Sequence, residues 1–313
     1  MAVSRKQKHS VIETLSKEFA LPMDVVQQMT DRYADLVTDR VERGFESFPD
    51  LPYGVMTLDS WSCLKPGCTL IYGQDSSVKS SLAKRIARSA RFKGCTVLYV
   101  DADHKLTAGD KEYLRGCYLT GATEAAAVHH IFHNRLVDVL IIDTITAMLP
   151  KTQQYLIHHA RKSVPYIVIV GQMRYDMESN RMVPAVWDSI ASGAYQHIHL
   201  TNHEQIDVDG CDMTRVYAQV SKTNDVSLRN GTTAWMVKNH EINNVLTGFD
   251  LLQCAGRIQS VGPVKDLDGE EYGSIHDITA KGDTLLHAAW QSMTKGVFDE
   301  YLYECGPLSE LSE

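Results

Sequence analysis

The stretch Thr69-Leu-Ile-Tyr-Gly-Gln-Asp-Ser-Ser-Val-Lys-Ser-Ser-Leu82 decides the fold of this chain. It begins with a short apolar run that ends in glycine, which is typical of a buried strand that enters a loop. Residues 80–93, directly after the loop, are predicted to form a helix. The sequence therefore predicts a strand, a loop and a helix in immediate succession.

Apolar runs and helical stretches alternate beyond this unit. Strands are predicted at 96–101, 137–143 and 166–170, with helices at 123–134 and 153–162. Unbroken apolar strands that alternate with helices are the signature of a parallel sheet covered on both faces. The shorter alternating runs at 197–200, 215–220 and 234–237 predict antiparallel strands at the edge of the sheet. We expect an α/β fold with a central, mostly parallel β-sheet flanked by helices.

The length of 313 residues favours one core with small appendages. Apolar residues at helical spacing predict an N-terminal helical segment within residues 1–48. The core is expected at 49–247 and a small C-terminal region at 248–313. No apolar stretch is long enough to cross a bilayer and no apolar signal core follows Met1, so a cytoplasmic location without a membrane is expected.

The amino-acid composition further limits the kinds of protein that this chain can be. The chain is 44% hydrophobic and 22% charged, as in ordinary globular proteins. Its seven cysteines are scattered without a C-x-x-C pair, which favours reduced thiols over zinc ligands or a disulfide framework. A formal net charge of −8 argues against a protein that coats nucleic acid by bulk charge, yet local basic clusters can still bind phosphates.

Residues 73–80 match the phosphate-loop pattern G-x-x-x-x-G-K-[ST], except that Val78 replaces the second glycine. In such loops backbone N–H groups surround the phosphates of a nucleotide, the lysine (Lys79) reaches the β- and γ-phosphates and the hydroxyl (Ser80) coordinates Mg²⁺. Valine is strained if its position needs a positive φ and tolerated if φ is helical. The alternative is a serine-rich turn with Lys79 as a solvated charge. The predicted phosphate-binding residues are Gly73, Gln74, Asp75, Ser76, Ser77, Val78, Lys79, Ser80 and Ser81.

Two acidic groups at strand ends are candidate partners of this loop. Asp143 follows the apolar run Val-Leu-Ile-Ile, where a carboxylate could hold the water shell of Mg²⁺. Taken alone, such an aspartate is as often a helix cap or a turn residue. Asp103, in Asp101-Ala-Asp-His104, offers a carboxylate that could act as general base on an attacking water, or simply belong to a polar turn.

Taken together, these motifs resemble the RecA family of strand-exchange recombinases, and most closely the UvsX-like recombinases of large tailed phages. The resemblance covers about 53–249 and also 272–303, and its motifs are Tyr72-Gly-Gln-Asp-Ser-Ser-Val-Lys-Ser-Ser81, Tyr99-Val-Asp-Ala-Asp-His104, Val137-Asp-Val-Leu-Ile-Ile-Asp-Thr-Ile-Thr-Ala-Met-Leu-Pro150 and Gly171-Gln-Met-Arg174. UvsX-like recombinases also carry a bulky residue where Val78 stands. The resemblance implies a RecA-type core that binds ATP and Mg²⁺, and an N-terminal helical segment (1–48) that serves oligomerisation by docking on the adjacent subunit.

The resemblance also implies roles for single residues. Lys79 and Ser80 contact the phosphates and Mg²⁺, Asp143 is the acidic residue at the strand end, and Asp103 stands in place of the family's catalytic glutamate. Gln172 is the implied γ-phosphate sensor. Lys222 matches a lysine that reaches the phosphates from the neighbouring subunit, whereas Asn224 stands where a second lysine is expected.

Two DNA-binding loops are implied as well. The second begins after Gln172, where Arg174 and Arg181 suit phosphate contacts and Trp187 suits stacking on bases. The alternative makes Trp187 a buried anchor and leaves the arginines solvated. The interval from Asp143 to Gln172 is shorter than in bacterial RecA proteins, so that little of the first loop remains; its candidate residues are Lys151, His158, His159, Arg161 and Lys162.

The resemblance therefore implies an ATP-dependent DNA recombinase of DNA recombination and repair. Such a protein forms homo-oligomeric filaments on single-stranded DNA and pairs it with homologous double-stranded DNA, in the bacterial host cytoplasm if a phage encodes it. Its DNA-dependent ATPase is expected to be slow, because aspartate is one methylene shorter than glutamate. The runner-up is a RecA-like nucleotide-binding structural or regulatory assembly protein without strand exchange. A hexameric helicase is less well supported, since no arginine-finger signal is present.

Overall fold

The computed structural model describes residues 48–59, 62–74, 78–114, 118–120, 137–177, 180–186, 188–208, 211–222, 232–238, 241–254, 258–259, 264–266 and 271–273. The predicted N-terminal helical segment before residue 48 and the predicted helix at 123–134 lie outside these ranges. The described helices are α3 (Met56–Asp59), α4 (Lys79–Phe92), α5 (Ala108–Leu114), the 3-10 helix η2 (Ile145–Ala147), α7 (Pro150–Ser163), α8 (Asp188–Gly193) and α9 (Asn244–Cys254).

The described strands form two sheets. The large one contains β1 (Gly67–Gly73), β2 (Val97–Asp101), β3 (Tyr118–Thr120), β4 (Val139–Asp143), β5 (Tyr166–Asp176), β6 (Arg181–Pro184), β7 (Gln196–Val208), β8 (Cys211–Lys222), β9 (Thr232–Lys238) and β10 (Glu241–Ile242). Its order is β10-β9-β8-β7-β1-β5-β4-β2-β3, with β6 paired to β5 outside this path. The small antiparallel sheet contains β11 (Ile258–Gln259), β12 (Val264–Asp266) and β13 (Glu271–Gly273).

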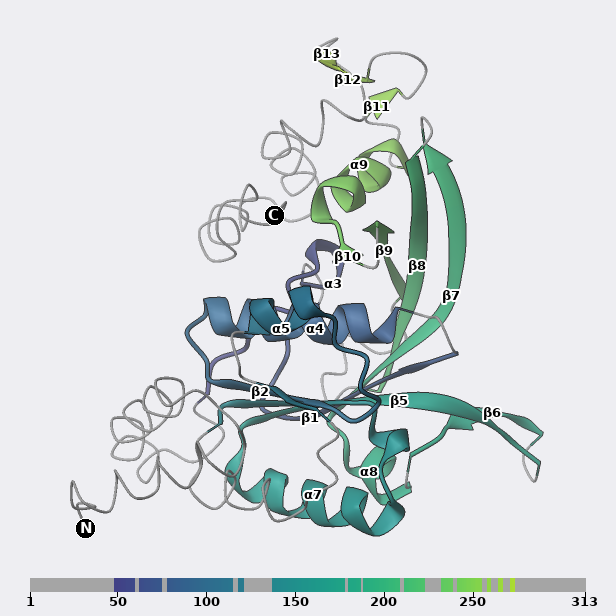
Figure 1. Ribbon diagram of the computed structural model, residues 1–313. Helices are drawn as coiled ribbons and strands as arrows, with labels where there is room; N and C mark the ends of the chain where they lie inside the picture. The colour runs from purple at the N-terminus through teal and green to yellow at the C-terminus, as the bar shows by residue number, and fades with distance from the viewer. Residues whose placement is uncertain are drawn as a thin grey trace, which may run out of the picture.

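Strands β7, β1, β5, β4, β2 and β3 run parallel, and β8, β9 and β10 continue the sheet antiparallel. Helices α4 and α5 cover one face of the parallel part, while α7 and α8 cover the other (Figure 1). Each face has its own apolar core, because every residue of β2 and β4 is buried and successive side chains point to opposite faces. The expected α/β class with a mostly parallel central sheet is confirmed.

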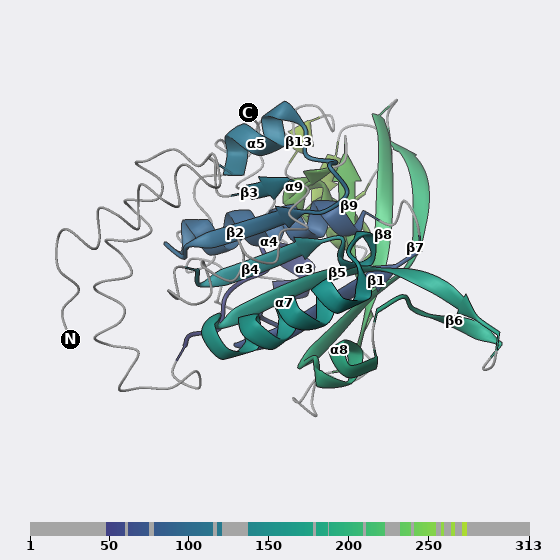
Figure 2. The ribbon, with the colours of Figure 1, turned by 60° about the horizontal axis from the view of Figure 1, so that its bottom comes forward.

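Several elements differ in length from the sequence-based expectation. The strands expected at 197–200 and 215–220 are only parts of the long strands β7 and β8, which bend away from the rest of the sheet (Figure 2). Moreover, β7 is antiparallel only to β8, since it pairs parallel to β1. Strand β5 continues past Gly171 into a hairpin with β6. These extensions carry polar residues, so an apolar run could not reveal them.

No helix in the described ranges is long and apolar enough to cross a bilayer. The domain limits at 48 and 247 stay predictions. Helix α9 packs against β9 and α3, and an ion pair between Arg215 of β8 and Asp250 of α9 joins this helix to the large sheet. The guanidinium also donates to the Asp250 carboxylate through Nε at 3.0 Å, which makes the contact bidentate.

Candidate nucleotide-binding site

The predicted site residues gather at the carboxyl ends of the parallel strands. Gly73 ends β1 directly opposite Gln172 of β5, and Asp101 ends β2 opposite Asp143 of β4. From β1 the chain crosses one face through α4, whereas from β5 it crosses the other face through α8 to reach β7 on the far side of β1. The connections diverge between β1 and β5, and such a point in an open α/β sheet is where ligands bind.

The phosphate loop joins β1 to α4 as predicted, although residues 75–77 lie outside the described ranges. Lys79 is the first residue of α4 and is 8% exposed. Its ammonium donates to the carbonyl oxygens of Gly73 at 3.1 Å and Gln74 at 2.6 Å, so that it lies within the loop. Ser81 is buried in the first turn of α4. The alternative of a solvated Lys79 at the surface is not what the structure shows.

Val78 has φ 61° and ψ 23°, the left-handed conformation that glycine adopts freely. For other residues this conformation costs roughly 1–2 kcal/mol, and a β-branched side chain is especially unsuited to it. The sequence left open whether this position needs a positive φ, and the structure shows that it does. The half-buried valine side chain packs against the core beneath α4, and this contact offsets part of the cost.

Asp143 is buried and accepts two side-chain hydrogen bonds. The hydroxyl of Tyr99 donates to Asp143 Oδ2 at 2.6 Å, and the hydroxyl of Ser80 is a second donor to the carboxylate. Burial raises the pKa of Asp143, which the hydroxyls oppose and the carboxylates of Asp101 and Asp103 reinforce. Ser80 and Asp143, the two predicted magnesium ligands, are therefore brought together, and their oxygens are the donors that Mg²⁺ prefers.

The two aspartates of the segment 101–103 have different environments. Asp101 is 2% exposed, and its carboxylate accepts the backbone N–H groups of Lys105 at 3.0 Å and Leu106 at 2.9 Å, which fixes the turn after β2. The side chain of Asp103 is 17% exposed and forms an ion pair with Lys105 Nζ at 2.7 Å. His104 between them has φ 57°, which folds the chain so that the lysine reaches back. Asp103, the predicted general base, is thus already paired with the ammonium group of Lys105.

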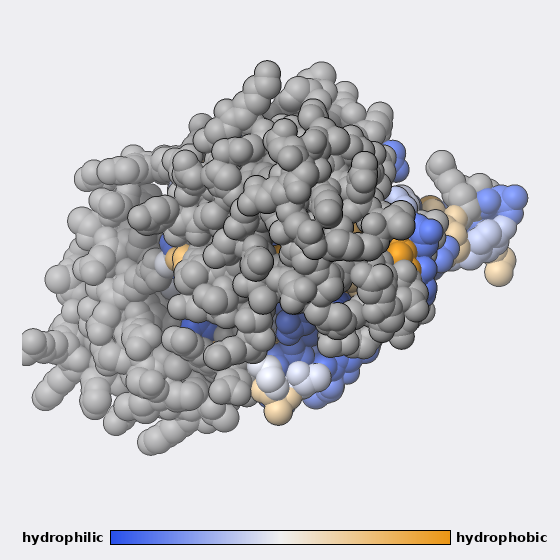
Figure 3. Space-filling view, turned by 90° about the horizontal axis from the view of Figure 1, so that it is seen from above, coloured by the Kyte–Doolittle hydropathy of each residue, from blue (hydrophilic) through white to orange (hydrophobic). Residues whose placement is uncertain are grey.

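Gln172 lies beside Gly73, and its carbonyl accepts the N–H of Ala185 at 2.7 Å. Beyond it, β5 and β6 project from the body of the protein (Figure 3). Arg174 is exposed on this hairpin, as are three apolar side chains: Tyr175 at 56%, Met177 at 89% and Met182 at 42%. The backbone of Arg181 lies in β6, whereas Trp187 lies outside the described residues.

Two groups of predicted residues do not join this site within one chain. Lys222 pairs with His197 of β7, which is level with Leu70 in the middle of β1 rather than with Gly73 at the start of the phosphate loop. The basic residues predicted for a first DNA loop, Lys151, His158, His159, Arg161 and Lys162, all lie on α7. Only residues 144–149 connect β4 to this helix, so the described chain has no long loop here.

Sequence reasoning missed Tyr99 and Thr144. Tyr99 is fully buried in β2, yet its hydroxyl reaches Asp143 on the adjacent strand. The hydroxyl of Thr144 donates to the carbonyl of Val170 at 2.8 Å and so ties the end of β4 to β5. A tyrosine two residues before an aspartate in an apolar run was the available signal for the first. Nothing in the sequence indicated the second.

Comparison with known proteins relates part of this chain to RecA proteins. No protein-family model matches the chain. RecA of Geobacter metallireducens is 28% identical over 152 residues, which are 40% of this chain and 45% of the relative. RecA of Chlorobium chlorochromatii is 26% identical over 159 residues, 47% of this chain and 42% of the relative. RecA of Clostridium botulinum (strain Eklund 17B / Type B) is 31% identical over 94 residues, 26% of each.

Among solved structures, the crystal structure of the RadB recombinase matches 61% of this chain and 98% of its own, with a TM-score of 0.47 and 17% identity. That similarity bears on neither activity nor partners. The chain spans less than half the length of each of the three RecA proteins above. Over that part of its length, the chain is homologous to RecA proteins.

Proposed function

We propose that this chain is an ATP-dependent DNA recombinase that forms filaments on single-stranded DNA and pairs it with a homologous duplex. The observation that carries the proposal is the convergence of Lys79, Ser80 and Asp143 at the carboxyl ends of the parallel strands. The partial homology with RecA proteins supports it. Such a protein would act in the cytoplasm, that of the bacterial host if a phage encodes it.

The nucleotide site is proposed to work through this chain's own side chains. Lys79 leaves the carbonyls of Gly73 and Gln74 to bind the β- and γ-phosphates, while Ser80 and Asp143 provide oxygen ligands for Mg²⁺. Bound Mg²⁺ neutralises phosphate charge. Asp103 orients a water and takes its proton as the water attacks the γ-phosphorus, and ADP leaves. Gln172, which lies beside the loop, contacts the γ-phosphate and so acts as its sensor.

The DNA contacts and the subunit contacts belong to the same proposal. Arg174 and Arg181 of the β5–β6 hairpin neutralise phosphates of single-stranded DNA, and Trp187 stacks on its bases. The backbone of Lys222 is level with the middle of β1 and not with its own phosphate loop, and so we assign this lysine to the loop of a neighbouring subunit in a filament. The bulky Val78 favours the UvsX-like branch of the family.

A second candidate function is favoured by the ion pair between Asp103 and Lys105. A carboxylate that is occupied by an ammonium is less available to a water, and Val78 holds the loop at a conformational cost. Both features suit a protein that binds nucleotide and acts by assembly, without turnover or strand exchange.

The test is ATP hydrolysis with and without single-stranded DNA for the wild type and Lys79→Ala. Lys93→Ala, at the other end of α4, is the matched control. Turnover that rises with DNA, is lost in Lys79→Ala and persists in Lys93→Ala supports the recombinase. Joint molecules formed from homologous DNA separate it from the assembly protein. Full DNA-dependent turnover in Lys79→Ala contradicts the proposal.

A further inference from the structure

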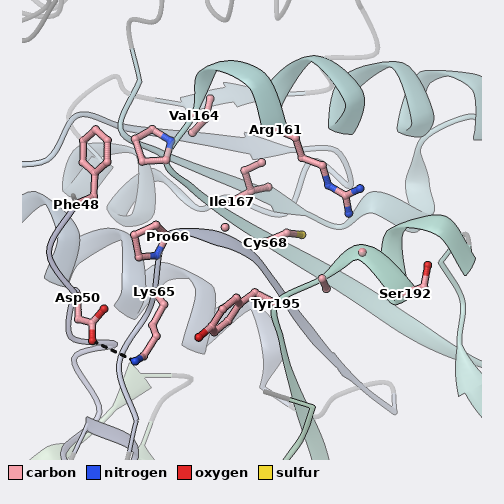
Figure 4. Close-up of a pocket in the computed structure, with 14 residues that line it drawn as sticks. Phe48, Asp50, Lys65, Pro66, Cys68, Arg161, Val164, Ile167, Ser192 and Tyr195 are labelled. Atoms are coloured by element: carbon pink, nitrogen blue, oxygen red, sulfur yellow. Dashed lines mark ion pairs between the residues drawn. The ribbon is translucent and has the colours of Figure 1, made fainter. Parts of the chain in front are cut away.

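A cavity lies at the amino ends of β1 and β5, at the edge of the sheet opposite to the phosphate loop (Figure 4). Its volume is about 760 Å³. Cavities that hold small molecules in proteins usually measure roughly 300–1,000 Å³. The cavity is therefore large enough for a small organic ligand, and no role proposed above uses it.

Arg161 gives this cavity its chemical character. It lies in the last turn of α7 and points toward the segment that contains Ser192 (Figure 4). The guanidinium lies against Gly193, where an added Cβ would come within 2.5 Å of Nη2 and 2.7 Å of Nη1. Only glycine leaves room for the guanidinium in this position. Within the described part of the chain, Arg161 takes part in no ion pair.

The other charges of the cavity cancel each other. Asp50 and Lys65 form an ion pair at 3.5 Å across from Arg161 (Figure 4). The remaining wall includes the buried side chains of Val164, Ile167 and Cys68. The described lining thus combines one cationic fork, a neutral ion pair and an apolar surface.

We propose that this cavity binds a small monocarboxylate with an apolar body. The planar guanidinium matches a carboxylate through two parallel hydrogen bonds, and one cation matches one negative charge. The apolar wall takes up the body of the ligand, as in most small-molecule sites. This site is separate from the proposed nucleotide site, so either proposal can fail without the other.

The test uses 4-phenylbutyrate as the probe and 4-phenylbutanamide as its neutral counterpart, with binding to the full chain followed by calorimetry and ligand-observed NMR. The wild type should bind the acid at least about tenfold more tightly than the amide, because a bidentate charged contact is lost with the amide. Arg161→Gln should abolish this preference. Arg161→Lys keeps the positive charge but cannot form two parallel hydrogen bonds to a carboxylate. It should therefore retain only part of the preference for the acid over the amide.

Two further variants separate position from charge. Gly193→Ala keeps every charge yet displaces the guanidinium, so it should weaken binding of the acid about as much as Arg161→Gln does. Lys162→Gln removes the neighbouring exposed charge on α7 and should leave binding unchanged. Thermal unfolding of each variant confirms that it is folded. Equal affinity for acid and amide, an unaffected Arg161→Gln, or no saturable binding of the acid at millimolar concentration overturns the proposal.

Discussion

Asp143 is a buried acid. Burial disfavours its charged form, whereas the hydroxyls of Tyr99 and Ser80 donate hydrogen bonds to its carboxylate. Its pKa is raised above the ordinary 3.8, first by burial. The folded state therefore holds the proton more tightly than the unfolded chain does. Ionised Asp143 costs stability above the raised pKa, and the cost disappears as the pH falls to the unfolded value.

Asp143→Asn should consequently raise the free energy of unfolding at pH 7 by roughly 1 kcal/mol in the absence of nucleotide and metal. The gain over the wild type should shrink as the pH is lowered toward 3.8. Urea unfolding across this pH range measures it. The same variant should lose the Mg²⁺-dependent part of the stabilisation by ATP. A variant that is less stable at pH 7 and keeps that stabilisation speaks against both statements.

Val78 has a left-handed backbone conformation, which valine disfavours. Val78→Gly should raise the free energy of unfolding by about 1 kcal/mol, since relief of the left-handed strain exceeds the lost packing and the added freedom of the unfolded chain. Val78→Ala, which retains a Cβ at φ 61°, is the control and should not gain. Denaturant unfolding compares the two. Equal stability of the glycine and alanine variants would show that the backbone is not strained.

At the scale of elements, the β5–β6 hairpin stands out because it extends the sheet beyond the core, against which Met173 at its base still packs. Arg174, Tyr175 and Met177 are exposed on it, and exposed side chains contribute little to stability. Their exposure suits contact with another molecule. The hairpin also begins directly after Gln172, so β5 connects the proposed nucleotide site to the proposed DNA surface.

Arg174→Gln should weaken binding of single-stranded DNA and lower the slope of log affinity against log salt by about 0.7, the contribution of one phosphate contact in a single strand. Fluorescence anisotropy over a salt series measures this slope. Arg91→Gln, at the end of α4, serves as the control and should leave it unchanged. An unchanged slope in Arg174→Gln would remove the residue from the proposed DNA surface. Thermal stability should be the same for all three proteins.

At the scale of the whole molecule, Lys222 lies two strands from β1 and level with Leu70, in the middle of that strand, whereas the phosphate loop follows Gly73 at its end. Within one chain the backbone of Lys222 is therefore not beside the loop. If Lys222 serves catalysis, we expect it to do so in another copy of the chain. Head-to-tail contacts of this kind generate open filaments when they do not close into rings.

A mixing experiment tests this arrangement. Lys79→Ala and Lys222→Ala should each lack DNA-stimulated turnover, but an equimolar mixture should regain about one quarter of wild-type activity, because a random head-to-tail assembly forms that share of intact junctions. The double variant Lys79→Ala/Lys222→Ala mixed with either single variant should regain none. Absence of recovery in the first mixture, with both variants folded, would place Lys222 outside the site.

Sequence alone determined the strand–loop–helix unit around Gly73 and the parallel sheet, whereas phosphate binding by the loop stays a prediction. These follow from short-range patterns, since an unbroken apolar run such as that before Asp143 is buried in almost any arrangement. The lengths of β7 and β8 did not follow, because their outer parts are polar and are held by pairing between strands.

Only the tertiary structure decided three matters. It set the left-handed backbone of Val78, it placed Tyr99 and Ser80 on the carboxylate of Asp143, and it laid the guanidinium of Arg161 over Gly193. Each depends on contacts between segments far apart in the chain, or on a backbone angle that the residue itself disfavours. Local sequence determines what a segment prefers, whereas packing against distant segments determines which preferences are met.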